Sequence, residues 1–358
     1  MKQRVLIFTT AYKPLIGGAE LALEEVTKRL PEVFFDIITA RFSDAPVYEN
    51  RDNVAIYRVG SKWSLPLLGA IAGLKLAQKH SYAAFHAFQA SYGAMAGALL
   101  SLIKPAVPFI VTLQEGKNLP LQNIFIKIAR NLILKRASKI TAISEYLANF
   151  AKKVNSRAEI IVIPNGVNVA KFSIFNFQFS KKKKTVITIS RLVPKNGIDI
   201  LIKAMKNLPY RLVIVGDGIE RQKLINLARN LGVADRVDFI GPVPNKIICD
   251  YLQCAFVFTR PSRSEGLGTA FLEAMAAGVP VIGTPVGGIP DFLKHEETGL
   301  LVPTENPEEL AKAITRIYDD SILREKLAAN GFALVKEKYD WDKIAKQYYE
   351  TLYRHSGI

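Results

Sequence analysis

The stretch Ser264-Glu-Gly-Leu-Gly-Thr-Ala-Phe-Leu-Glu273, which continues as Ala-Met-Ala-Ala-Gly-Val-Pro280, is the most informative part of the sequence. It follows a β-rich run at Phe256–Thr259 and combines a glycine-bearing turn with the start of a helix. Ligands of open α/β folds bind at the carboxyl ends of the parallel strands, and we expect this turn to lie there. The free backbone N–H groups that open the helix, from Gly266 to Thr269, favour a bound phosphate.

Short β-rich runs alternate with helical stretches along the chain as far as Pro307, after which the pattern is helical. Alternation of this kind builds parallel sheets that helices cover on both faces. Examples of the expected helices are Ala19–Leu30 and Gly93–Ile103. The expected strands are Arg4–Thr9, Val33–Thr39, Val54–Val59, Ala84–Ala87, Phe109–Leu113, Lys139–Ala142, Ile160–Ile163, Val186–Ser190, Arg211–Val215, Val237–Ile240, Phe256–Thr259, Pro280–Ile282 and Gly299–Val302.

The chain of 358 residues is long enough for two domains. A run of four lysines, Lys181–Lys184, cannot enter a core, so we place the domain junction there. We expect a first domain over residues 1–175, a linker over 176–184 and a second domain over 185–336. The last segment, residues 337–358, is expected to be a helix that crosses back to the first domain.

Glu265 and Glu273 match the E-x7-E motif of the retaining glycosyltransferases of family 4. Further segments resemble that family in the expected order along nearly the whole chain. They are Ile16-Gly-Gly-Ala-Glu20, Ile163-Pro-Asn-Gly-Val-Asn168, Ser190-Arg-Leu-Val-Pro194, Val215-Gly-Asp-Gly218, Gly278-Val-Pro-Val-Ile282 and Gly287-Gly-Ile-Pro290. The resemblance implies an α/β chain of the GT-B type, in which two Rossmann-like, doubly wound parallel-sheet domains face each other across a cleft.

The resemblance also implies roles for individual residues. Glu265 would contact a hydroxyl of the donor sugar, Glu273 would hold the ribose hydroxyls, and Arg191 would neutralise the leaving diphosphate. Gly17 and Gly18 would let the first loop approach the donor phosphate and the acceptor, because glycine has no Cβ to block close contact. The other residues expected at the donor are Lys195, Asn196, Gly216, Gly266, Leu267, Gly268 and Thr269.

Two positions depart from the family pattern. The lysine expected five residues after Arg191 is replaced by Asn196, and the neighbouring Lys195 is the alternative cation for the diphosphate. Gln114 stands where a histidine is common; it can hydrogen-bond a sugar hydroxyl or a backbone group but cannot titrate near neutral pH. The expected catalytic residues are therefore Glu265, Arg191 and Gln114.

The net charge of +16 is concentrated in the first half of the chain. Residues 1–184 hold 26 Lys and Arg against 11 Asp and Glu, whereas residues 185–358 hold 22 against 21. This asymmetry favours an anionic partner, and we expect a membrane surface that meets the basic residues between 51 and 184. Asn118–Ala137 combines apolar with basic residues, as does a helix that lies in a membrane interface. An ordinary helix packed on the first sheet stays an alternative.

The histidines and cysteines lack the spacing of metal ligands. His86 ends a first-domain strand, where it is either a buried structural residue or a neighbour of the acceptor. Cys249 and Cys254 are expected to be buried and reduced, and the Asp-x-Asp sequence at Asp340–Asp342 is interpreted as helix capping. We therefore expect no metal and no cofactor besides the nucleotide sugar substrate.

These features favour transfer of a sugar from a UDP- or GDP-linked donor to a glycan or lipid-linked acceptor, with retention of the anomeric configuration. The expected setting is the synthesis of cell-envelope polysaccharide or glycolipid, in the cytoplasm or on the inner face of the membrane. Three alternatives stay open: a GT-B relative with phosphorylase or epimerase chemistry, a catalytically inactive homologue, and a nucleic-acid-binding protein. No nucleic-acid-binding motif is found, so we expect no nucleic acid partner.

Overall fold

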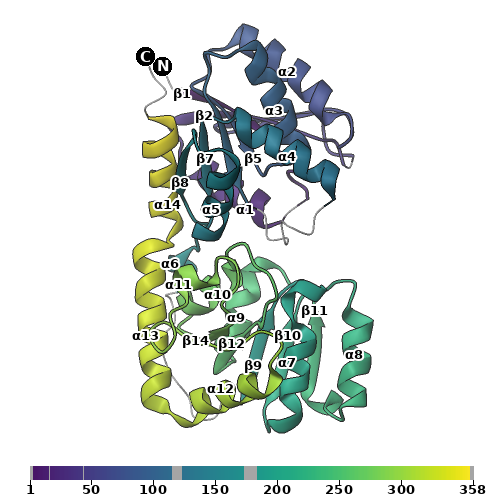
Figure 1. Cartoon of the computed structure of the whole chain (residues 1–358), viewed down its shortest axis with the longest axis vertical. Coiled ribbons are helices and arrows are strands. Elements are labelled where there is room, and N and C mark those ends of the chain that lie inside the picture. Colours follow the sequence, from purple (N-terminus) through teal and green to yellow (C-terminus); the bar gives the residue numbers. More distant parts are fainter. Residues whose placement is uncertain (1–2, 16, 43, 115–122, 173–183, 355–358) are drawn as a thin grey trace. The chain divides into compact units, whose positions relative to one another are not determined.

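The computed structural model of the chain describes residues 3–15, 17–42, 44–114, 123–172 and 184–354. It divides into two units: the first is formed by Met1–Asn165 and Trp341–Ile358, and the second by Gly166–Asp340 (Figure 1). The sequence predicted boundaries after residues 175 and 336, whereas the units divide after residues 165 and 340. Of the predicted linker, only Lys184 is among the described residues.

The first unit is built on an eight-stranded sheet in the order β3-β4-β2-β1-β5-β6-β7-β8. All neighbouring strands are parallel except β3 and β4, which pair antiparallel at one edge. Ile7, for example, lies beside Ile37 on one side and His86 on the other. The strands are β1 Gln3–Phe8, β2 Val33–Thr39, β3 Tyr48–Arg51, β4 Val54–Arg58, β5 Ala84–Phe88, β6 Phe109–Leu113, β7 Lys139–Ala142 and β8 Glu159–Val162.

Helices cover both faces of this sheet. They are α1 Gly18–Lys28, α2 Leu65–Lys79, α3 Tyr92–Ile103, α4 Ile124–Arg136, α5 Glu145–Val154 and, from the end of the chain, α14 Trp341–Tyr348. On β1, Val5 and Ile7 belong to the core that includes α1 and α14, whereas Leu6 and Phe8 lie against Gly73 of α2. The side chains of β1 that point to either face of the sheet are apolar because a parallel sheet is buried on both faces. Helices α2, α3 and α4 are neighbours in one layer (Figure 1).

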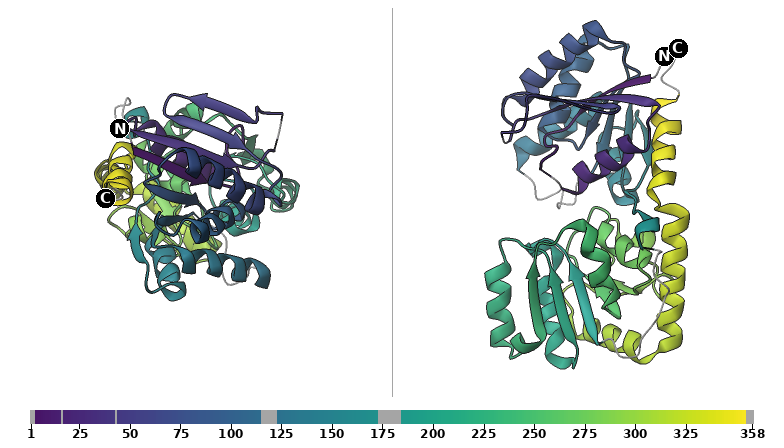
Figure 2. Two further views of the ribbon diagram at one scale, coloured as in Figure 1. Left: turned by 90° about the horizontal axis from the view of Figure 1, so that it is seen from above. Right: turned by 180° about the vertical axis from the view of Figure 1, so that it is seen from behind.

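The end of the chain packs on the first unit. Helix α14 contacts α1, and the π-helical turn Tyr349–Tyr353 continues it. Trp341, Tyr348 and Tyr353 are buried in the same core as α1, and the Tyr353 hydroxyl lies 2.8 Å from Nδ1 of His86. The first unit is therefore built from both ends of the chain, as the rear view in Figure 2 also shows.

The second unit contains a six-stranded parallel sheet in the order β11-β10-β9-β12-β13-β14. Its strands are β9 Thr185–Ile189, β10 Arg211–Val215, β11 Val237–Gly241, β12 Val257–Thr259, β13 Val281–Gly283 and β14 Leu300–Leu301. Its helices are α6 Val169–Phe172, α7 Ile198–Ala204, α8 Arg221–Asn230, α9 Ile248–Gln253, α10 Thr269–Ala276, α11 Ile289–Phe292, α12 Pro307–Asp319 and α13 Ser321–Lys338. Short 3-10 turns lie at Pro194–Asn196, Met205–Asn207, Ala234–Arg236 and Asn245–Ile247.

Two sets of apolar contacts hold this second sheet between its helices. Side chains of β9 and β10 share one core with α7, α8, α12 and α13. A row of aromatic rings, Phe258 on β12, Phe271 on α10 and Phe292 on α11, joins successive elements, with ring centroids 5.0 Å and 5.8 Å apart. The row fixes α10, which begins at the predicted glycine turn.

The α/β fold with two parallel-sheet domains, predicted from the sequence, is confirmed. Each expected strand is present with ends that differ by at most one residue. Strand β3 was not expected because its sequence, Tyr48-Glu-Asn-Arg51, has no apolar run; it is a short exposed edge strand. The prediction of two buried cysteines is wrong for Cys254, which is exposed, whereas Cys249 is buried.

The structure also bears on the membrane and on the Asp-x-Asp sequence. Of the amphipathic stretch expected over Asn118–Ala137, residues 118–122 lie outside the described ranges, and α4 forms most of the rest. Among the described residues, no helix has the length and apolar character needed to cross a membrane. Asp342 forms an ion pair at 2.6 Å with Arg29, the residue that follows α1, so one of the two aspartates fastens the C-terminal segment to the rest of the first unit.

Candidate functional site

Two loops meet at the carboxyl ends of β9 and β12, which are neighbouring strands of the second sheet. From β9 the chain proceeds to β10 and β11 on one side, whereas β12, β13 and β14 lie on the other side. Such a reversal of strand order leaves a crevice outside the strand ends, where ligands bind in open α/β folds. The two loops are joined by a hydrogen bond of 2.7 Å from the Arg263 N–H to the Lys195 carbonyl oxygen.

A buried arginine, Arg260, faces the carboxylate of Glu265 between these loops. Its Nη2 donates to Glu265 Oε2, its Nε donates to Ser262 Oγ over 3.2 Å, and its Cζ lies 5.0 Å from the centroid of the Phe271 ring. Lys195 approaches the same carboxylate from the other loop, with Nζ 3.7 Å from Glu265 Oε1. Two cations therefore share one carboxylate, which leaves an excess of positive charge at the loops.

The neighbourhood of Lys195 is electrostatically unfavourable for a further cation. Burial contributes most to a lowered pKa of Lys195; the charges of Arg260 and Arg191 lower it further, and Glu265 partly opposes them. Arg191 itself is exposed beside the cluster. An anion bound here would relieve this repulsion, so the group of cations favours a ligand with negative charge.

The helix α10 begins directly after the second loop. Gly268 precedes it with a φ of 103°, a left-handed conformation that a side chain would strain. The first turn is closed by a bond of 2.9 Å from the Phe271 N–H to the Gly268 carbonyl, and the N–H groups of residues 267–269 have no intrahelical acceptor. The Gly266 N–H, expected at the donor, donates to Glu265 Oε1 over 3.0 Å.

Glu273 lies in the second turn of α10 and is partly buried. Desolvation raises its pKa to about 7, although the charges of Lys171 and Arg260 favour the carboxylate. Lys171, on α6, donates from Nζ to Asn245 Oδ1 over 3.1 Å, and its carbonyl oxygen accepts from Cys249 Sγ at 3.5 Å. Burial raises the pKa of the Cys249 thiol to about 11, so the thiol stays protonated near neutral pH.

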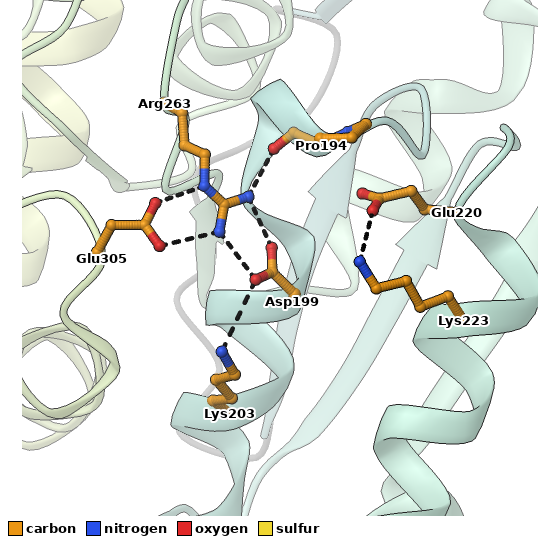
Figure 3. A network of polar contacts seen from close by, with 7 residues as sticks. All are labelled: Pro194, Asp199, Lys203, Glu220, Lys223, Arg263 and Glu305. Carbon is orange, nitrogen blue, oxygen red and sulfur yellow. Dashed lines mark hydrogen bonds and ion pairs between the residues drawn. The ribbon is translucent and has the colours of Figure 1, made fainter.

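Arg263 fastens the loop after β12 to α7 and to the segment before α12 (Figure 3). Its Nη1 and Nη2 donate to the two carboxylate oxygens of Asp199 over 2.9 and 2.8 Å, and Nη2 also donates to Glu305 Oε2 over 3.0 Å. A third contact reaches the Pro194 carbonyl oxygen at 2.6 Å. These hydrogen bonds of the guanidinium, which we call the Arg263 fork, hold the loop that carries Glu265 against the loop that carries Lys195.

Two residues that were expected to bind the donor, Asn196 and Gly216, have structural roles. Asn196 is buried and its Nδ2 donates to the Arg191 carbonyl oxygen over 2.7 Å, so Lys195 rather than Asn196 reaches the charged cluster. Gly216 follows β10, and a Cβ there would lie 2.0 Å from the Ser190 carbonyl oxygen. Its lack of a side chain is therefore required by the close approach of the two loops.

The expected residues of the first unit lie at the carboxyl ends of its own strands. Gly17 precedes α1 and donates from its N–H to Glu20 Oε2 over 2.9 Å. Gln114, after β6, is buried and forms a reciprocal amide pair with Asn165: its Nε2 donates over 3.1 Å, and Asn165 Nδ2 donates back over 2.8 Å. Gln114 therefore holds the turn of the Ile163-Pro-Asn-Gly segment.

His86 is a structural residue of the first unit. Its Nδ1 lies 2.8 Å from the Tyr353 hydroxyl and its Nε2 2.7 Å from Thr112 Oγ1, and burial lowers its pKa to about 3. The imidazole is therefore neutral at neutral pH and packs in the core. The structure favours the interpretation of His86 as a buried structural residue over that of a neighbour of the acceptor.

The structure thus brings together Arg191, Lys195, Glu265, Gly266, Leu267, Gly268, Thr269 and Glu273 in the second unit. Sequence reasoning missed Arg260 and Lys171, which contribute charge to the same place. Within the ranges that the structure describes, no group of three or more His, Cys, Asp or Glu side chains is arranged to hold a metal ion.

Comparison with known proteins gives matches over almost the entire chain. The family described as Glycosyltransferase Family 4 matches residues 16–171, and the one described as Glycosyl transferases group 1 matches residues 170–333. An uncharacterised glycosyltransferase of Methanocaldococcus jannaschii is 30% identical, with 96% of both chains covered. A GDP-mannose-dependent alpha-(1-6)-phosphatidylinositol monomannoside mannosyltransferase of Mycobacterium tuberculosis is 29% identical, also with 96% of both chains covered. The crystal structure of HepE from Anabaena, in complex with UDP-glucose, superposes with a TM-score of 0.81 at 22% identity, with 98% of this chain and 99% of that chain covered.

Proposed function

The chain belongs to glycosyltransferase family 4, whose members have the GT-B fold, and we propose that it moves a sugar from a nucleoside diphosphate sugar to a glycan or lipid-linked acceptor with retention of configuration. The observation that carries this proposal is the cluster of Arg260, Lys195 and Glu265, with Arg191 beside it, at the reversal point of the second sheet. The N-terminus of α10 adds partial positive charge to the same place.

The proposed chemistry requires that charge. The acceptor hydroxyl oxygen bonds to the anomeric carbon while the bond from that carbon to the diphosphate oxygen breaks. The acceptor proton passes to the departing phosphate oxygen, on the same face of the sugar, and the configuration is therefore kept. Negative charge grows on the diphosphate, where Arg191, Lys195, Arg260 and the N–H groups of residues 267–269 stabilise it; each such donor is worth about 3–4 kcal/mol.

The two glutamates of the site suit the neutral parts of the donor. Glu265 binds a sugar hydroxyl in this proposal, because its carboxylate lies between the two loops beside the cations. Glu273, one turn further along α10, binds the ribose hydroxyls, as an acidic residue does in dinucleotide sites. Because the side chains of the site themselves supply the cations, we propose a transfer that requires no bound metal.

The relatives support the class of donor. One acts with GDP-mannose on a phosphatidylinositol mannoside, and the structural neighbour was solved with UDP-glucose, so a UDP- or GDP-linked hexose is proposed here. On the acceptor side, Gly18 starts α1 at a position where an added Cβ would meet, among the described residues, no other atom within 4 Å. The described part of the fold therefore does not demand glycine at Gly18, which supports a role in the approach of a ligand.

A screen of nucleotides tests this proposal. The melting temperature of the chain is measured with UDP, GDP, ADP and the corresponding hexose conjugates, since a ligand that binds the native state raises it. We expect one nucleoside diphosphate series to stabilise the chain. The conjugate identified is then incubated with acceptor glycans, the anomeric configuration of the product is read by NMR, and the assay is repeated with EDTA.

Three outcomes would contradict parts of the proposal. If no nucleoside diphosphate or conjugate shifts the melting temperature, the donor site is wrongly assigned. A product with inverted configuration would refute retention alone, and loss of turnover in EDTA that Mg²⁺ restores would refute transfer without a metal.

A further inference from the structure

The outer surface of helices α2, α3 and α4 in the first unit is apolar and basic at once. Its exposed apolar side chains are Trp63, Leu67, Leu68, Ile71, Tyr92, Leu102, Ile103, Ile124, Phe125, Ile126, Ile128 and Leu132. Monomeric proteins rarely leave so many large apolar side chains together on neighbouring helices without a partner. We call this surface the α2–α4 face; Figure 1 shows its three helices side by side.

The spacing of the exposed residues makes stripes along the helices. On α2, Leu67, Ile71, Lys75 and Lys79 follow one another at intervals of four residues, and all four are exposed. Residues four apart lie on the same side of a helix, so each stripe is apolar in its first turns and basic in its last. Helix α4 repeats the arrangement, since Ile124, Ile128 and Leu132 precede the exposed Lys135.

Acidic residues are almost absent from this part of the chain. Between Asp52 and Glu145 there are 11 Lys and Arg but a single acidic residue, Glu115. None of the helices α2, α3 and α4 contains an Asp or Glu. A face with both apolar and cationic groups, whose helices contain no acidic residue, complements a bilayer that contains anionic lipids, because apolar side chains enter the interface while the lysines meet headgroups.

The apolar first turns of α2 and α4, and Tyr92 at the start of α3, lie at one edge of the sheet, whereas Leu102 and Ile103 extend the apolar surface to the last turn of α3. Each helix follows a strand of the parallel sheet, so its first turn lies near the carboxyl ends of the strands. Trp63 before α2 and Tyr92 at the start of α3 are both exposed, with ring centroids 5.2 Å apart, and such amphipathic rings favour membrane interfaces. Gly18 and Gln114 follow strands at the same edge, where an acceptor is expected.

We propose that the α2–α4 face docks the chain on the surface of an anionic lipid bilayer, with the first turns of α2, α3 and α4 in the interface and the lysines at headgroups. Docking in this orientation brings the acceptor edge of the first unit to the membrane. A second copy of the chain fits the face less well, because a symmetric contact would bring two cationic surfaces together.

The test is co-sedimentation of the full chain with vesicles, without donor or acceptor, so that its outcome is independent of the proposed transfer reaction. Vesicles of phosphatidylcholine alone are compared with vesicles of equimolar phosphatidylcholine and phosphatidylglycerol at low salt. We expect binding to the anionic vesicles that weakens as salt is raised. We expect the double variant Leu67→Ser/Phe125→Ser to bind at least about tenfold more weakly.

The second unit offers a matched control. Ile219 and Ile322 are as exposed as the tested residues, at 86% and 82% against 76% for Phe125. The double variant Ile219→Ser/Ile322→Ser should therefore bind within about twofold of the wild type. The pair Lys75→Gln/Lys79→Gln should weaken binding at least about tenfold, since each basic residue near the membrane contributes about 1 kcal/mol.

The wild-type chain carries its own probe, because it has only two tryptophans and Trp341 is buried while Trp63 is exposed. Lipids brominated in the acyl chain should quench Trp63 emission on binding, and Trp63→Phe should lose that quenching. Absence of both sedimentation and quenching would overturn the proposal. So would dimerisation or nucleic acid binding that Leu67→Ser/Phe125→Ser abolishes while vesicle binding is unchanged, because the face would then serve that partner.

Discussion

We propose that Arg260 neutralises the diphosphate, although the sequence pattern does not mark this residue. Its guanidinium is buried between Glu265 and the Phe271 ring, at the start of α10. We expect Arg260→Gln to lower kcat/KM by at least about 30-fold, because a buried charged donor to the leaving group is worth about 2–4 kcal/mol. Steady-state kinetics with the donor found in the nucleotide screen measure this, and Arg211→Gln, at an exposed arginine of the same unit, should leave kcat/KM unchanged.

A second measurement separates contact with the diphosphate from a mere support of Glu265. If Arg260 binds the diphosphate, Arg260→Gln weakens the affinity for the nucleoside diphosphate much more than that for the nucleoside. Arg260→Lys should restore part of the loss, because it keeps the charge with fewer donors. Equal loss for nucleoside and nucleoside diphosphate would instead assign Arg260 to the positioning of Glu265.

Glu273 predicts a pH dependence of donor binding. Burial raises its pKa to about 7, so the carboxylate that we propose to accept from the ribose hydroxyls forms only as pH rises through that value. We expect the affinity for the donor to increase between about pH 6 and about pH 8, and Glu273→Gln to abolish this increase. A nucleoside diphosphate sugar is the correct ligand for calorimetric titration, because both of its phosphates are diesters and do not titrate in this range.

The raised pKa of Glu273 also predicts how the stability of the fold depends on pH. The folded pKa lies above the unfolded value of 4.5, so the native state binds more protons than the unfolded chain between these values. Stability is therefore lost as pH rises from about 4.5 through about 7, by about 3 kcal/mol. Glu273→Gln should consequently be more stable than the wild type above pH 7 and equal to it at low pH in denaturant melts; a wild type that is the more stable at high pH would contradict this.

Arg260 and Lys171 show why part of the site could not be predicted from the sequence. An arginine between an apolar strand and a proline has the pattern of a solvated residue, and only the packing of α10 places it against Phe271. Lys171 is remote in sequence from Glu273, and the fold of α6 beside α10 brings their charges together. The turn at Glu265, in contrast, could be predicted because its glycines and both glutamates lie within one short motif.

The loop after β12 is positioned from outside by Arg263. Its fork to Asp199 and its contact with Glu305 are partly exposed, so we expect Arg263→Ala to lower the free energy of unfolding by about 1–2 kcal/mol. Turnover should fall by more than stability alone explains, since the Arg263 segment is bonded to the loop that carries Lys195. Urea melts and kinetics on the same protein check both effects.

A second ion pair, which Figure 3 also shows, provides the control for Arg263→Ala. Lys223 of α8 pairs with Glu220 at 3.2 Å, and the lysine side chain is 77% exposed. Lys223→Gln should therefore change stability by less than about 0.5 kcal/mol and leave turnover unchanged. Equal effects of Lys223→Gln and Arg263→Ala would show that the fork does not position the loop.

Strands and helices were more predictable than the contacts between them. The buried strands of both sheets are continuous apolar runs, which sequence patterns reveal directly. The edge strand β3 is polar and exposed, so it carries no such signal and is specified by its antiparallel pairing with β4. The reciprocal pair of Gln114 and Asn165 is likewise a tertiary contact between two loops that the sequence keeps apart.

The first unit depends on the last residues of the chain, because α14 and the turn Tyr349–Tyr353 fill its core. Removal of Trp341, Tyr348, Leu352 and Tyr353 costs about 3 kcal/mol or more for each large buried side chain. For four side chains this is about 12 kcal/mol or more, which is comparable with the whole stability of about 5–15 kcal/mol that a domain possesses. It would also leave His86 without its partner on Nδ1. A chain that ends at Asp340 should therefore lose the folded first unit while the second unit keeps its own core.

Differential scanning calorimetry measures this prediction. We expect the truncated chain to retain the heat absorption of the second unit alone and to lose amide exchange protection in β1 and β5. The control is Arg29→Gln, which removes the ion pairs of Arg29 with the exposed Asp342 and with Glu25 but leaves the apolar C-terminal core intact. It should lower the melting temperature by no more than a few degrees, since such surface pairs contribute about 0–1 kcal/mol each. A truncated chain in which both units melt as in the wild type would show that the C-terminal segment is an attachment to the first unit rather than part of its core.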